Sequence, residues 1–99
     1  MSINQARGEV GLMINGQKSA LCLTLGALAE IEASLGCKTL AELQLRLSAL
    51  SAGELLTVIA ALLRGGGNGD LVPALSLADV SPSAAAKAVA EAFRLGLTD

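Results

Sequence analysis

The sequence predicts a mostly helical α+β fold, with an N-terminal β-hairpin followed by about four helices packed in one small domain. Two observations support this fold class. Before Leu23, apolar residues alternate with polar or small ones, which is typical of strands; after Thr24 they recur every three or four residues, which is typical of helices. The length of 99 residues is typical of one domain, so the sequence predicts a single domain over residues 1–99.

The hairpin is the most sharply defined element. Residues 1–7 lack periodicity, and we expect them to be disordered. Residues 8–23 then form the hairpin, because Asn15-Gly16 suits the two positive-φ positions of a two-residue turn. This loop sets Ile14 opposite Gln17. One face of the hairpin should therefore carry the side chains that meet the helices: Val10, Leu12, Ile14, Leu21 and Leu23.

Residues 24–96 are predicted to be the helical part. The first helix has Thr24 as its N-cap and Gly36 as its left-handed end. Its helical spacing places four apolar side chains on one stripe: Leu25, Leu28, Ile31 and Leu35. We expect this helix, over residues 24–36, to be central to the domain, with the hairpin packed on it.

Three further helices have recognisable starts. Thr39 with Glu42 is one capping box and Ser51 with Glu54 is another, which open helices that run to about residues 48 and 64. Ser81-Pro82 opens the last helix, which Gly96 closes. Four glycines within residues 65–70 predict a flexible loop that tolerates substitution.

Composition excludes several classes of function. The net charge is −2 and no basic run is present, so we expect no nucleic-acid partner. The longest apolar run, Leu55–Leu63, is too short to span a bilayer, and the start lacks a signal peptide's apolar core. We therefore expect a cytoplasmic protein with no membrane contact, in which Cys22 and Cys37 remain free thiols.

The residue types also argue against catalysis. The chain has no His, Trp or Tyr, and its Ser, Thr and Lys residues show no triad arrangement. The glycine cluster follows a helix and lacks the Lys-Ser/Thr of a phosphate-binding loop. We expect no enzyme activity, no cofactor and no metal site. What remains is a protein-binding module whose candidate surface is apolar and helical: Leu25, Leu28, Leu55, Ile59 and Leu62.

Several stretches together resemble the small tail protein family of gene transfer agents and related prophages, grouped with phage tail assembly chaperones. They occur in the family's order and cover most of the chain, and the second is the most specific: Arg7–Val10, Leu23–Glu32, Leu35–Gly36 and Leu62–Gly67. The same family label has also been attached to tail tube proteins.

The resemblance implies a tail assembly chaperone that binds the tape measure protein, assists assembly of the tail tube protein, and is absent from the finished particle. The alternative is a structural tail tube subunit that stays in the particle. A second alternative is an unrelated helical adaptor. The chain could also form a homo-oligomer through the free edge of its hairpin.

Overall fold

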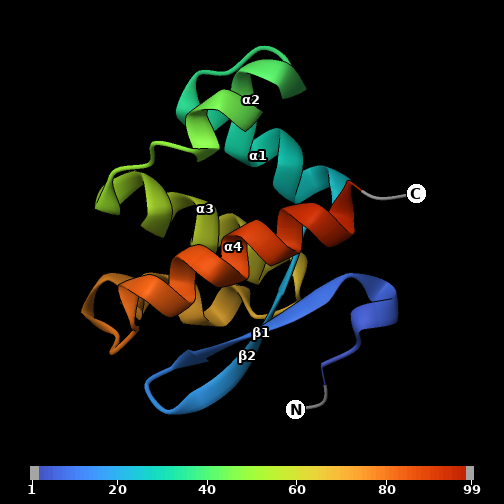
Figure 1. The fold of residues 1–99 in the computed structure, drawn as a ribbon. Coiled ribbons are helices and arrows are strands. Elements are labelled where there is room, and N and C mark those ends of the chain that lie inside the picture. Colours follow the sequence, from blue (N-terminus) through green and yellow to red (C-terminus); the bar gives the residue numbers. More distant parts are fainter. Residues whose placement is uncertain (1–2, 98–99) are drawn as a thin grey trace.

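The computed structural model describes residues 3–97, which form two strands, four α-helices and two 3-10 helices. In chain order these are η1 (Gln5–Arg7), β1 (Glu9–Ile14), β2 (Gln17–Cys22), α1 (Leu25–Leu35), α2 (Leu40–Leu47), α3 (Ala52–Gly65), η2 (Gly69–Leu77) and α4 (Pro82–Gly96). Figure 1 shows the hairpin at one end of the molecule, α3 and α4 in the middle, and α1 and α2 at the other end. The predicted α+β class is confirmed.

The hairpin has the predicted turn and register. Strands β1 and β2 pair antiparallel with Ile14 opposite Gln17, and both Asn15 and Gly16 have positive φ, at 52° and 78°. The side chains predicted to face inward are all buried: Val10, Leu12, Ile14, Leu21 and Leu23. They meet α3 and α4, so the prediction that the hairpin packs on the helix over residues 24–36 is wrong.

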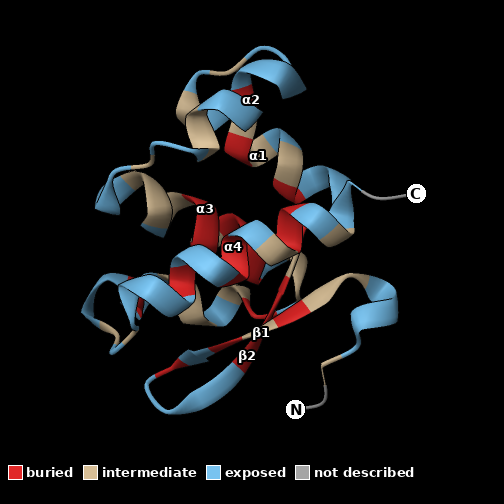
Figure 2. Cartoon of the chain, in the orientation of Figure 1, coloured by how far each residue is buried: buried red, intermediate tan, exposed pale blue. Residues whose placement is uncertain are grey.

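The central helix is α3, which corrects the expectation that the helix over residues 24–36 would organise the fold. Helix α3 packs against β2, α1, α4 and η2. It can do so because its apolar residues cover more than one face, as expected of a helix inside a core. The buried positions in Figure 2 gather accordingly on α3, on the facing side of α4 and on the hairpin, and those of α3 are Val58, Ile59, Ala61, Leu62 and Leu63.

Helix α1 begins and ends as predicted but is rotated differently. Thr24 Oγ1 accepts a hydrogen bond from the Ala27 amide at 3.1 Å, and Gly36 ends the helix with φ of 70°. Ala27 and Ile31 are the buried residues of α1. Leu25 is 82% exposed because it lies about 120° around the helix from Ile31 at 3.6 residues per turn. It does not belong to the inward stripe.

Both α2 and α3 begin at a predicted N-cap residue, and α3 has the complete capping box. The Glu42 amide donates to Thr39 Oγ1 at 3.1 Å, while the Glu42 carboxylate accepts from the Lys38 amide at 2.6 Å, one residue before the expected partner. At the start of α3 the box is complete, since the Ser51 amide donates to Glu54 Oε1 and the Glu54 amide donates to Ser51 Oγ. Both helix starts were therefore predictable from local sequence.

The connection before α4 is fastened to the hairpin tip. The Asn15 amide donates to the Asp79 carbonyl at 3.0 Å, and the Asp79 amide donates to Asn15 Oδ1 at 2.6 Å. Two residues later Ser81 Oγ accepts from the Ala84 amide, with Pro82 at the first helical position as predicted. The hairpin and α4 are thus held together at one end of their contact.

The predicted flexible loop after α3 is instead a close-packed junction with β2. A Cβ added to Gly66 would lie 2.2 Å from the Ala20 carbonyl oxygen, and one added to Gly65 would lie 2.2 Å from that of Cys22. Asn68 is 8% exposed, and its Nδ2 donates to the Ala20 carbonyl at 3.2 Å. These glycines allow the end of α3 to approach the backbone of β2, which the expectation of a tolerant connector overlooked.

The N-terminal segment is also more structured than the sequence suggested. Residues Gln5–Arg7 form η1, and Asn4 Oδ1 caps it by accepting from the Ala6 amide at 3.1 Å. The Asn4 amide in turn donates to Glu9 Oε1 at 3.0 Å. The predicted disorder therefore does not describe residues 5–7, while residues 1–2 lie outside the described part of the chain.

Candidate functional site

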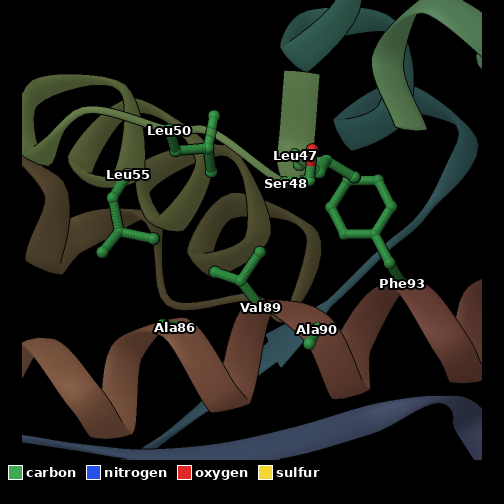
Figure 3. Close-up of a pocket in the computed structure, with 8 residues that line it drawn as sticks. All are labelled: Leu47, Ser48, Leu50, Leu55, Ala86, Val89, Ala90 and Phe93. Atoms are coloured by element: carbon green, nitrogen blue, oxygen red, sulfur yellow. The ribbon is translucent and has the colours of Figure 1, made fainter. Parts of the chain in front are cut away.

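An apolar hollow lies between the end of α2, the start of α3 and the exposed side of α4; we call it the α2–α4 cleft. Its volume is about 280 Å³, and it is lined by Leu47, Ser48, Leu50, Leu55, Ala86, Val89, Ala90 and Phe93. In Figure 3 the Phe93 ring points from α4 toward Leu47 and Ser48, and Val89 points into the same space. Ser48 Oγ donates to the Leu45 carbonyl at 2.8 Å, so its hydroxyl already has a partner.

Helical spacing on α4 accounts for the floor of the cleft. Ala86, Val89, Ala90 and Phe93 recur at three- and four-residue intervals, which places them on one side of the helix. The two alanines are exposed and small, so they leave room beside the larger side chains. The cleft therefore exists because alanine occupies positions where leucine would fill the space.

A second apolar hollow adjoins the first. It has a volume of about 200 Å³ and is lined by Ala52, Leu55, Leu56, Ile59, Leu75, Val80, Pro82 and Ala85. Leu55 lines both hollows, so they meet at this side chain. Leu56, at 37% exposed, brings apolar surface to the rim of the second hollow. Together the two hollows follow α4 for much of its length.

Two ion pairs join α3 to its neighbours, one to α2 and one to α1. Arg46 of α2 pairs with Glu54 of α3, and Arg64 of α3 pairs with Glu30 of α1 through Nε at 3.0 Å and through Nη2. A hydrogen bond from the Ser51 amide, followed by one from Arg46, holds the pKa of Glu54 below its ordinary value. The hydrogen bond from Arg64 lowers the pKa of Glu30. Because these groups are exposed, the pairs orient α1 and α2 more than they stabilise them.

The structure separates the five residues predicted to bind a partner. Leu55 lies in the α2–α4 cleft and Leu28 is half-buried on α1. Leu25 is exposed at the start of α1. Ile59 is 2% exposed but lines the second hollow together with Leu55, whereas Leu62 is 0% exposed and lies in the core of this chain. The five do not form one surface.

The sequence did not predict that residues of α4 would line the cleft. Val89 and Phe93 fall on the inward stripe of α4, and they are buried, yet each also lines the cleft. Leu47 and Leu50 precede the Ser51 capping box; Leu47 ends α2, and Leu50 lies in the connection to α3. An available signal was the pair of alanines, Ala86 and Ala90, on the α4 side that carries the aromatic residue.

The described residues offer little for chemistry at a metal or a thiol. Among residues 3–97, no group of three His, Cys, Asp or Glu side chains could hold a metal ion. The structure has Cys22 and Cys37 as free thiols. Burial, with a smaller contribution from Glu9, raises the pKa of Cys22, which disfavours the reactive thiolate. In the same part of the chain, no helix combines the length and apolarity needed to cross a bilayer.

The fold and the cleft thus define a small α+β protein with an apolar hollow beside its last helix. A family model described as "Phage tail tube protein, GTA-gp10" matches residues 7–99. The chain therefore belongs to this family of phage and gene transfer agent tail proteins. No curated protein and no solved structure matches the chain.

Proposed function

We propose that this chain is a tail tube subunit of a gene transfer agent or related prophage particle. The observation that carries this proposal is the family match over residues 7–99, whose description names a tail tube protein. It reverses the order expected from the sequence, in which a chaperone came first and a tube subunit second. In this role the protein's partners are further tail proteins, including other copies of itself, and it performs no catalysis.

A second candidate is a tail assembly chaperone that binds the tape measure protein and leaves before the particle is complete. A specific observation favours it: the described residues form one two-stranded sheet, so each copy would contribute little sheet to a tube wall. The apolar α2–α4 cleft also suits the apolar side of a helical segment. The two candidates differ in whether the protein remains in the particle.

Quantitative mass spectrometry of purified particles separates the candidates. A tube subunit is recovered from finished tails at a copy number matching the repeating tube. A chaperone is absent from finished tails but is recovered with tape measure protein from cells that express the tail genes without heads. Failure to find the chain in either fraction overturns both candidates and leaves the unrelated helical adaptor.

Substitution in the cleft tests where the tail partner binds. Ala90→Arg places a long charged side chain in the cleft from an exposed position of α4, where arginine is a good helix former. Ala84→Arg is the matched control, since Ala84 is exposed on the same helix outside both hollows. We expect Ala90→Arg to lower the yield of tailed particles and Ala84→Arg to leave it unchanged. Equal yields for the two variants would exclude the cleft as the binding surface.

A further inference from the structure

Helix α2 is the least firmly held helix of the described chain. Leu43 is its buried residue, whereas α3 buries five. Its main packing partner is α1. In Figure 1, α2 lies at the end of the molecule opposite the hairpin, and Figure 2 shows its surface as mostly exposed. A helix with so few buried side chains has little to resist local opening.

Hollows border α2 on two sides. The α2–α4 cleft reaches Leu47 and Ser48. A separate hollow of about 470 Å³ lies toward the end of α1 and is lined by Leu35, Gly36, Cys37, Glu42, Leu45, Arg46 and Ala49. On these sides α2 faces solvent-filled hollows rather than packed side chains, so few apolar contacts hold the helix down.

The connections of α2 allow it to move as a unit. On one side Gly36 ends α1 in the left-handed conformation and is followed by a short non-helical segment. On the other side residues 48–51 lead to α3. The ion pair between Arg46 and Glu54 spans the second connection and joins side chains that are 40% and 28% exposed. A solvent-accessible pair of this kind restrains the helix only weakly.

We infer that α2 is a hinged lid over the apolar α2–α4 cleft, and that it opens while α3, α4 and the hairpin stay folded. In the closed state Leu47 and Ser48 face the Phe93 ring. Opening moves Leu47 and Ser48 away from the Phe93 ring, which is 6% exposed in the closed state, and widens a cleft in which Ala86 and Ala90 are already exposed. The position of α2 sets the width of the apolar hollow, and this inference stands without the proposed tail function.

The chain contains a single aromatic residue, which makes the lid directly observable. Incorporating 4-fluorophenylalanine labels Phe93 alone, so the protein gives one fluorine resonance from the floor of the cleft. We expect this resonance to show microsecond-to-millisecond exchange broadening that relaxation dispersion resolves. Amide exchange should give α2 protection factors at least ten-fold lower than those of α3. Equal protection of α2 and α3, with no fluorine exchange, would overturn the inference.

Filling the cleft supplies the second test. Ala90→Leu adds apolar volume from α4 beneath the lid, whereas Ala84→Leu makes the same change outside the cleft. We expect Ala90→Leu to raise α2 protection several-fold and suppress the fluorine exchange, with α3 unchanged and the control without effect. Arg46→Gln, which removes the tie to Glu54, should lower α2 protection instead. Parallel changes in α2 and α3 would show global unfolding rather than a lid.

Discussion

Replacing Gly66 by alanine tests the close junction between the end of α3 and β2. The backbone at Gly66 has φ of −85°, which alanine adopts without strain, so the added methyl group is the whole perturbation. That methyl would lie 2.2 Å from the Ala20 carbonyl oxygen and 2.8 Å from its carbon. Ala20 pairs with Gly11 in the hairpin, so it cannot retreat alone.

The expected cost combines two losses. Forcing an extra methyl into a packed site costs about 1–3 kcal/mol. Moving β2 away from α3 breaks the bond from Asn68 Nδ2 to the Ala20 carbonyl, and an unpaired buried group costs about 1–3 kcal/mol. The lower unfolded-state entropy of alanine offsets about 0.4–1 kcal/mol. We expect a net loss between about 1 and 6 kcal/mol, centred near about 3 kcal/mol, which corresponds to a fall in Tm of roughly 12–24 °C for a domain of this size.

Urea unfolding followed by far-UV circular dichroism measures this loss, with two glycine controls. A Cβ on Gly53 meets open space in the first turn of α3, so Gly53→Ala should be stabilising by up to about 1 kcal/mol. A Cβ on Gly67 also meets open space, but its φ of 81° makes Gly67→Ala cost about 1–2 kcal/mol. If Gly66→Ala stays within about 0.5 kcal/mol of the parent protein, the junction is not close-packed and the reasoning fails.

Three further predictions use the same unfolding assay. Leu62→Ala should cost about 3–4 kcal/mol by opening a cavity in the core, whereas Leu25→Ala should stay within about 0.5 kcal/mol. Because Arg64 lowers the pKa of Glu30, the stabilisation from Glu30 is present above the ordinary carboxyl pKa of about 4.3 and is lost as the pH falls through the lower folded-state value. Glu30→Gln should reduce this acid-dependent loss. Ser51→Ala removes the cap of α3 and should cost about 1 kcal/mol.

Each of these predictions has a contrary outcome. Similar losses for Leu62→Ala and Leu25→Ala would mean that α3 does not form the core. An unchanged pH profile in Glu30→Gln would show that the pair with Arg64 does not persist in solution. If Ser51→Ala leaves the free energy of unfolding unchanged, packing alone fixes the start of α3.

Local signals predicted the elements of this fold well. The Asn15-Gly16 turn fixed the strand register, and Thr24 and Ser51 marked helix starts, because turn geometry and capping depend on a few neighbouring residues. The rotation of α1 about its axis was harder to predict from the sequence. Leu25 has the right spacing for a stripe, but the position of α3 decides which side of α1 is buried, and no local rule reports that position.

The candidate site was harder to predict than the fold. Ile59 and Leu62 were chosen for their apolar character, which core residues and binding residues share. The α2–α4 cleft arises where α2 fails to fill the space above Ala86 and Ala90, and an unfilled space has no signature in one helix alone. The glycines after α3 indicated a loop, whereas their small size serves close packing against β2.

The clasp between Asn15 and Asp79 joins positions 64 residues apart, so the hairpin and the segment that fastens it are synthesised at different times. A ribosome releases β1 and β2 before α4, which covers β1 and follows every other described element. Until α4 emerges, Val10, Leu12 and Ile14 face water and neighbouring nascent chains, which favours aggregation. Contacts of such long sequence separation also close slowly. We therefore expect crowding of unfinished chains to lower the share of this protein that reaches its native fold.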